Sequence, residues 1–143
     1  MGITGSVGKT STKEVIASVL NQKYHTLKTQ GNFNNELGLP LTVFRLRDGD
    51  EIAVLEMGIS DFGEMARLTK IAKPDTCVIT NIGTCHLENL GDRDGVLKAK
   101  TEIFQSKVSR GYMVTKTKKM EQKVIEKNTS SINGCLLYTS PSP

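Results

Sequence analysis

The chain has 143 residues, of which 37% are hydrophobic, 24% charged and 5% aromatic, and its net charge is +4. This length and composition are typical of one globular domain and exclude disordered and fibrous proteins. No apolar run approaches the roughly 18 residues that span a membrane, and the N-terminus lacks the basic and apolar segments of a signal peptide. The three cysteines follow no disulfide or metal-binding spacing. We therefore expect a cytoplasmic, monomeric protein that does not insert into a membrane.

Segments with the patterns of strands and helices alternate along the chain. Strands are expected at 3–4, 24–28, 52–55, 77–79 and 112–114, helices at 10–22, 36–46, 61–71 and 94–108, and a long loop at 81–93. The apolar run 52–55 lies between acidic residues, which is typical of a buried parallel strand. The alternation predicts an α/β fold: a P-loop NTPase-like (Rossmann-like), mostly parallel sheet with helices on both faces.

The helix expected at 10–22 has apolar residues that predict its buried face. These are Val15, Ile16, Val19 and Leu20, and the outer face is expected to carry Lys13, Glu14 and Asn21. Lys13 is therefore expected in solvent.

The C-terminal part of the sequence differs from the rest. Lysines concentrate in the segment 115–127, where a basic helix would either bind nucleic acid or be solvated. No aromatic residues interleave with the lysines, which favours the solvated helix, so we expect no nucleic-acid partner. Residues 128–143 are rich in Asn, Ser and Thr and predict a disordered or non-native tail. Because the chain also begins with a partial strand, we expect a fragment of a longer protein.

A glycine-rich loop between the first strand and the first helix is the strongest motif. Its residues are Gly5, Ser6, Val7, Gly8, Lys9, Thr10 and Ser11. Glycines let backbone N–H groups point at phosphate oxygens, the lysine reaches the β- and γ-phosphates, and a hydroxyl binds Mg²⁺. The strict motif would have glycine where this chain has Ile3, and a plain turn before a helix is the alternative. The loop predicts a site for a nucleotide with Mg²⁺.

Two polar residues lie beyond the ends of expected strands. Glu56 follows the strand 52–55, and His86 lies in the loop after the strand 77–79. Parallel sheets bind ligands at the carboxyl ends of their strands. Glu56 is interpreted as a Mg²⁺ ligand or as a strand-end carboxylate in a turn. His86 is interpreted as a metal ligand or base, or as a solvated loop histidine.

Lys100 lies within an apolar stripe of the helix expected at 94–108. Its neighbours on that side are Val96, Leu97, Ile103 and Phe104, whereas Lys98 falls outside the stripe. A lysine inside such a stripe either extends its amine to solvent or has a functional role that depends on its burial. Both interpretations stay open.

Five motifs, in this order and spacing, resemble the Mur ligase family, the ATP-dependent amide-forming enzymes of peptidoglycan synthesis. They are the loop 4–10, the segment 31–42, Glu56-Met57-Gly58, Thr80-Asn81-Ile82-Gly83 followed by His86-Leu87-Glu88, and Ala99-Lys100 followed by Glu102-Ile103-Phe104. The segment 31–42 is most similar to the family member that adds D-alanyl-D-alanine. The resemblance covers residues 2–108, so we expect residues 1–114 to be part of the family's central, ATP-binding domain.

The resemblance implies a reaction and a role for each motif residue. It implies a ligase that uses ATP to join D-alanyl-D-alanine to UDP-N-acetylmuramoyl-tripeptide through an acyl phosphate. The loop 5–11 and Asn81 would bind ATP, Thr10 and Glu56 would bind Mg²⁺, His86 would bind a second Mg²⁺, and Lys100 would be carbamylated and contribute to the metal site. Lys9, His86 and Lys100 would be the catalytic residues. The alternatives are another Mur ligase or a folylpolyglutamate synthase-like ligase, and a P-loop nucleotide-binding module without ligase activity.

Overall fold

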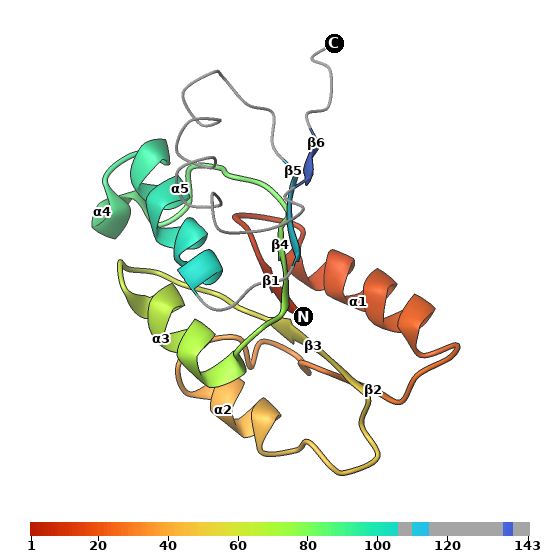
Figure 1. Cartoon of the computed structure of the whole chain (residues 1–143). Helices are drawn as coiled ribbons and strands as arrows, with labels where there is room; N and C mark the ends of the chain where they lie inside the picture. Colours follow the sequence, from red (N-terminus) through yellow and green to blue (C-terminus); the bar gives the residue numbers. More distant parts are fainter. Residues whose placement is uncertain (106–109, 115–135, 139–143) are drawn as a thin grey trace.

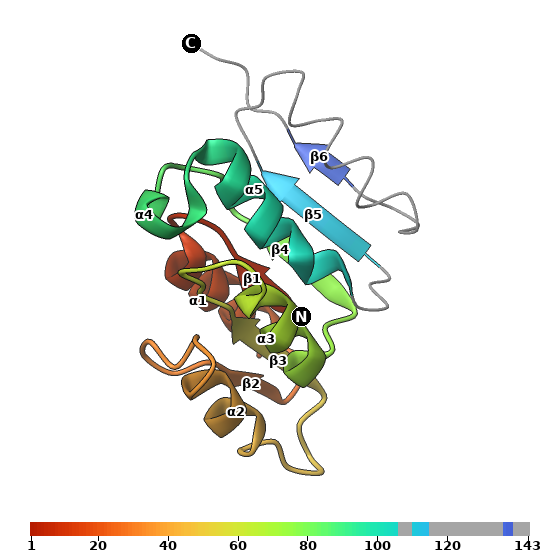
Figure 2. The same cartoon turned by 90° about the vertical axis from the view of Figure 1, so that its left-hand side faces the viewer.

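A parallel sheet forms the centre of the molecule (Figures 1 and 2). The computed structural model describes residues 1–105, 110–114 and 136–138, and its strands have the order β2-β3-β1-β4-β5-β6. The strands are β1 (Gly2–Thr4), β2 (Thr26–Lys28), β3 (Ile52–Glu56), β4 (Thr76–Ile79), β5 (Arg110–Val114) and β6 (Leu136–Tyr138). All of their pairings are parallel. The predicted α/β fold is thereby confirmed.

Helices cover both faces of this sheet. They are α1 (Lys9–Leu20), α2 (Gly38–Val43), α3 (Glu64–Ala72), α4 (Leu87–Leu90), α5 (Arg93–Thr101) and the 3-10 helix η1 (Glu102–Gln105). Figure 1 shows α1 on one side of the sheet and α2, α3 and α5 on the other. In the part of the chain that the structure describes, no helix is long and apolar enough to cross a membrane.

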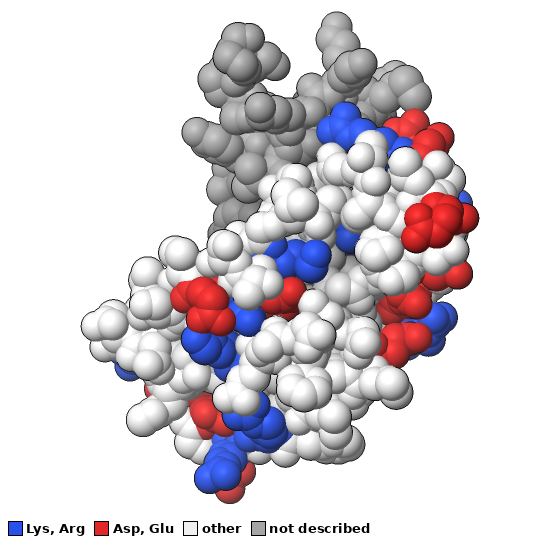
Figure 3. Space-filling model, turned by 180° about the vertical axis from the view of Figure 1, so that it is seen from behind, with Lys and Arg blue, Asp and Glu red and all other residues white. Residues whose placement is uncertain are grey.

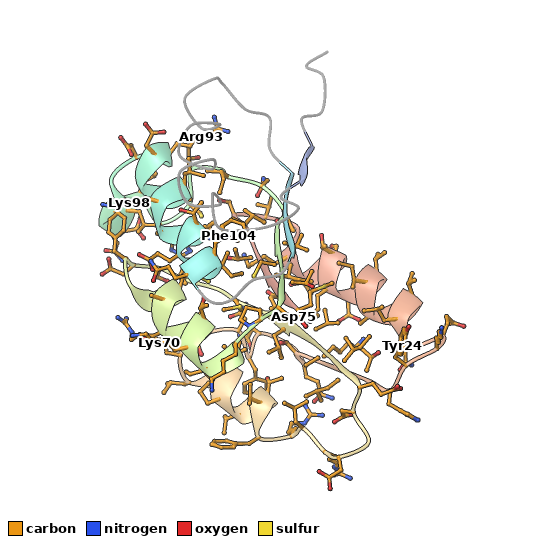
Figure 4. The ribbon with its side chains drawn as sticks, in the orientation of Figure 1. Tyr24, Lys70, Asp75, Arg93, Lys98 and Phe104 are labelled. Atoms are coloured by element: carbon orange, nitrogen blue, oxygen red, sulfur yellow. The ribbon has the colours of Figure 1, made fainter. Side chains whose placement is uncertain are left out.

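The larger apolar core lies on the side of α3 and α5. Its fully buried members include Met57, Met65, Leu68, Ile79, Leu97 and Ile103. Burial of each such side chain contributes about 1.5–3 kcal/mol. A smaller cluster of Ile3, Ala17 and Val54 lies against α1. Figure 4 shows Phe104 directed into the molecule and Lys98 on the outer side of α5, as the apolar stripe of this helix predicts.

The buried face of α1 matches the predicted one only in part, because Ile16 and Leu20 pack against the smaller cluster and the other predicted residues do not. Lys13 and Ala17 are buried, whereas Val15 and Val19 are 64% and 67% exposed. Positions 13 and 17 are one helical turn apart and share a face that positions 15 and 19 do not reach. The expectation that Lys13 lies in solvent is wrong, because a buried carboxylate, described below, compensates its charge.

The start of α3 depends on a residue from a distant part of the chain. The helix begins at Glu64 rather than at Asp61, after Gly63 with φ +77°. The Glu102 carboxylate accepts hydrogen bonds from the N–H groups of Gly63 and Ala66, both at 3.2 Å. These N–H groups have no partner within α3, so Glu102 caps the helix from outside.

Two further segments depart from expectation. The short helix α4 lies within the loop expected at 81–93. The expectation of a tail without structure over 128–143 is wrong at 136–138, because these residues form β6 and pair with β5. The remainder of that tail and the basic helix expected in 115–127 lie outside the described residues.

Candidate functional site

The glycine-rich loop connects β1 to α1 at the carboxyl edge of the sheet. Gly5 has φ +146° and Gly8 has φ +81°, which are backbone conformations that side chains disfavour. Gly8 directly precedes α1, so the free N–H groups of the first helical turn lie at the loop and favour an anion there. Nζ of Lys9 donates to the carbonyl oxygen of Gly5 at 2.9 Å. The loop thus places backbone donors and an ammonium together, as a phosphate requires.

The segment after β4 holds this loop in place. Thr80 Oγ1 donates to the carbonyl oxygen of Val7 at 2.6 Å, and the N–H of Val7 donates to Oδ1 of Asn81 at 2.9 Å. The N–H of Ser6 donates to the backbone oxygen of Asn81 at 3.1 Å, and the N–H of Gly83 donates to Oγ of Ser6 at 2.8 Å. The Asn81 side chain therefore contacts the loop itself, and its contact with ATP stays a prediction.

Glu56 ends β3 with a carboxylate that is 2% exposed. Its Oε1 accepts a hydrogen bond from Nδ2 of Asn34 at 2.8 Å. Its Oε2 lies 3.6 Å from Nζ of Lys13 and accepts no hydrogen bond within the described residues. The N–H of Glu56 donates to Oγ1 of Thr29 at 2.9 Å. One carboxylate oxygen is thus satisfied, and the other has only a charged neighbour.

A cavity of about 420 Å³ joins the start of α1 to the end of β3. Its lining consists of Gly8, Lys9, Thr10, Ser11, Gly31, Asn32, Asn34 and Glu56. The structure therefore brings Thr10 and Glu56 to the same space. A hydroxyl and a carboxylate oxygen without a hydrogen bond are hard oxygen ligands, which Mg²⁺ prefers. These two residues fit the metal that the sequence implies.

A second cavity, of about 450 Å³, adjoins the first, since Lys9 and Asn34 line both. Its lining also contains Cys85, His86, Lys100 and residues of the segments 34–37 and 58–60. His86 is exposed and precedes α4 with φ +55°. The structure thus brings Lys9, His86 and Lys100 to one cavity and Thr10 and Glu56 to its neighbour.

Lys100 is buried rather than extended to the surface, because it is 1% exposed. Burial lowers the pKa of its ammonium to about 8, the nearby Cys85 thiol raises that pKa in part, and the positive charge of Lys9 lowers it. Lys98, two residues earlier, is exposed and lies 5.7 Å from the centre of the Phe62 ring. The two lysines therefore differ as the apolar stripe predicts.

The described residues contain no cluster of three or more His, Cys, Asp and Glu side chains that could hold a metal ion. On the face shown in Figure 3, positive and negative side chains are interspersed.

Two residues beside Glu56 were missed by the sequence analysis. The sequence pattern placed Lys13 on the outer face of α1, because the apolar residues Val15 and Val19 lie on the opposite side of the helix. Asn34 lies in the asparagine-rich segment 31–42, which carried a family resemblance but no individual role. That concentration of amide side chains was the signal that could have identified it.

The chain matches the family model described as the Mur ligase middle domain over residues 3–140. Among curated proteins, it is 50% identical over 114 residues to the UDP-N-acetylmuramoyl-tripeptide–D-alanyl-D-alanine ligase of Bacillus subtilis, covering 80% of this chain and 25% of the relative. It is 40% identical over 114 residues to the same ligase of Escherichia coli, again with 80% and 25% coverage. The chain spans about a quarter of the length of these relatives.

Solved structures of MurF ligases also superpose on this chain. MurF from Acinetobacter baumannii superposes with a TM-score of 0.85 and 36% identity, covering 95% of this chain and 30% of that protein. MurF ligase from Thermotoga maritima in complex with ADP superposes with a TM-score of 0.80 and 38% identity, covering 99% of this chain and 32% of that protein. A folylpolyglutamate synthase mutant from L. casei is 18% identical with a TM-score of 0.65, which is a likeness of fold.

Proposed function

Because this chain belongs to the Mur ligase family, we propose that it is part of the ATP-binding domain of an ATP-dependent ligase. That ligase adds D-alanyl-D-alanine to UDP-N-acetylmuramoyl-tripeptide in the cytoplasm, as a monomer, during peptidoglycan synthesis. Identity of 50% to a curated ligase named for this reaction supports the proposal. The observation that carries it is the pair of adjoining cavities, where the loop lysine, Lys9, lies with His86 and Lys100 on one side and with Glu56 on the other.

ATP binds with its phosphates on the loop 5–11. The backbone N–H groups at the start of α1 surround the phosphate oxygens, and the helix dipole favours their negative charge. The Lys9 ammonium leaves the Gly5 carbonyl oxygen and pairs with the β- and γ-phosphates. The segment 80–83 keeps the loop in shape through its bonds to Ser6 and Val7.

Thr10 and Glu56 would hold one Mg²⁺, and His86 would hold a second. Lys100, as a neutral amine, would react with CO₂ to form an N–C bond and release one proton, and the resulting carbamate would contribute to the second metal site. The buried Lys100 ammonium has no ion pair among the described residues, which is unfavourable, and a carbamate would replace it with an anion among cations. When bound, the two Mg²⁺ ions offset the charge of the phosphoryl group in transfer.

The reaction requires activation of a carboxylate, because a free carboxylate has a poor leaving group. The substrate carboxylate attacks the γ-phosphorus of ATP, ADP leaves, and an acyl phosphate remains. The amine of D-alanyl-D-alanine then attacks the acyl carbon, an amide forms, and phosphate departs. Lys9 stabilises the charge that develops on the phosphoryl oxygens in the first step.

A trial of acceptors tests this function in the longer polypeptide that contains this chain. ADP release is measured with UDP-N-acetylmuramoyl-tripeptide and either D-alanyl-D-alanine, single amino acids or glutamate with a folate. We expect ADP release and an amide product with D-alanyl-D-alanine. Turnover with single amino acids alone would indicate another Mur ligase, and turnover with glutamate and a folate would indicate a folylpolyglutamate synthase-like enzyme. Mg²⁺-dependent ATP binding without turnover of any acceptor would indicate a nucleotide-binding module.

A further inference from the structure

Glu56 is held from two sides by side chains that belong to other elements. The amide of Asn34, in the loop before α2, donates to Oε1 at 2.8 Å. The ammonium of Lys13, in α1, lies 3.6 Å from Oε2. Lys13 and Glu56 are 1% and 2% exposed, so water contributes little to their solvation. The two oxygens of this carboxylate therefore have different environments.

Lys13 also belongs to a network of ion pairs. Its Nζ lies 3.2 Å from Oε1 of Glu14, and Glu14 also pairs with the exposed Lys28. Lys13 follows Lys9 by one turn of α1, so one helix carries both the phosphate-binding loop and the counter-charge of Glu56. This ion pair connects α1 with the end of β3, where Glu56 lines the 420 Å³ cavity.

The separation of 3.6 Å compensates the charge of Glu56 without a hydrogen bond to Oε2. Asn34 occupies the other oxygen. The pair therefore offsets the cost of burying a lone carboxylate and leaves Oε2 as a buried acceptor without a hydrogen bond among the described residues. We propose that Lys13 and Asn34 are positioning residues that orient Glu56 so that Oε2 binds the metal ion of a bound nucleotide. This inference rests on the proposed role of Glu56 as a Mg²⁺ ligand.

The test is the affinity of the 143-residue chain for ADP, measured once with Mg²⁺ and once with EDTA. The dissociation constant in EDTA divided by the dissociation constant in Mg²⁺ is called the magnesium advantage. A change in this ratio reports on metal binding, whereas an equal change in both constants reports on the loop. The variants are Lys13→Met, Asn34→Leu and Glu56→Gln. Lys28→Met is the matched control, because it removes a lysine of the same network that does not contact Glu56.

We expect Lys13→Met and Asn34→Leu each to reduce the magnesium advantage by about tenfold, the usual effect of losing a residue that orients a metal ligand. Glu56→Gln should reduce it at least as much, and Lys28→Met should not change it. A wild-type or larger advantage in Lys13→Met and Asn34→Leu, with loss in Glu56→Gln, would overturn this inference alone. An unchanged advantage in Glu56→Gln would overturn the Mg²⁺ role of Glu56 as well.

Thermal unfolding separates positioning from general stability. Lys13→Met leaves a buried carboxylate without its cation, so its unfolding midpoint should fall, and the added Glu56→Gln should restore it. The Asn34→Leu variant leaves the ion pair intact but removes the donor to the buried Oε1, so its midpoint should fall less than that of Lys13→Met. If Lys13→Met does not fold, the inference is tested with Asn34→Leu alone. A magnesium advantage equal to that of the wild type in this variant would overturn the inference.

Discussion

A Cβ atom on Gly5 would lie 2.0 Å from Oγ1 of Thr80. That distance is far shorter than any contact between atoms that are not bonded. The same hydroxyl donates to the carbonyl oxygen of Val7 at 2.6 Å, so the segment after β4 packs directly against the glycine-rich loop. The shape of the loop therefore depends on the absence of a side chain at position 5 as well as on its positive φ.

Gly5→Ala should displace Thr80 and distort the loop. We expect the affinity for ATP to fall by at least roughly tenfold, because several charge-assisted bonds of about 1.5–3 kcal/mol each lose their alignment. Titration with a fluorescent ATP analogue measures the effect. Gly49→Ala is the control, since no atom lies within 4 Å of a Cβ at that position. Unchanged affinity in Gly5→Ala would contradict the contact with Thr80.

Lys100→Met should stabilise the chain at neutral pH. The pKa of Lys100 falls from 10.5 to about 8 through burial, so the unfolded chain binds more protons than the folded chain between those values. The free energy of unfolding therefore rises with pH across that window, and the cost of the buried ammonium is fully present below about pH 8. Replacing it should add on the order of 1–3 kcal/mol at pH 7.

Urea unfolding in CO₂-free buffer measures this difference, which should shrink as the pH rises from 8 toward 10.5. Lys98→Met is the control, because Lys98 is exposed on the same helix, and it should change the free energy of unfolding by less than about 0.5 kcal/mol. A destabilised Lys100→Met variant at pH 7 would show that the ammonium has a favourable partner.

Part of the fold follows from the sequence where a strand is an apolar run bounded by polar residues. β3 shows this, since its run 52–55 identified a buried parallel strand and placed Glu56 at its end. The face of α1 was predicted only in part: Ile16 and Leu20 pack against the core, but position 13 is a lysine whose buried partner, Glu56, is distant in sequence. Strand β6 was missed because the surrounding segment is polar and its pairing with β5 is set by tertiary structure.

Glu102→Ala should destabilise the chain by about 1 kcal/mol, because the N–H groups of Gly63 and Ala66 lose the carboxylate that caps α3. Thermal or urea unfolding measures the change. Asp48→Ala, at an exposed position outside α3, is the control and should have little effect. Equal stabilities of the two variants would show that the cap contributes nothing measurable.

The 143-residue chain by itself should not form the ligase product. It spans about a quarter of its curated relatives, and positioning of the two substrates supplies much of such a barrier. Phosphate release with ATP, UDP-N-acetylmuramoyl-tripeptide and D-alanyl-D-alanine should stay at background. Sustained product formation by this chain would require that it hold both substrates itself.

Magnesium-dependent ATP binding by the wild-type chain and by Lys9→Ala tests the central claim most directly. Lys9 lines both cavities and donates to the carbonyl oxygen of Gly5 in the loop. Titration with a fluorescent ATP analogue in Mg²⁺ should give an affinity at least roughly tenfold weaker for Lys9→Ala, since a charge-assisted bond is lost. Equal affinities of the two proteins would contradict the assignment of the loop 5–11 as the ATP site.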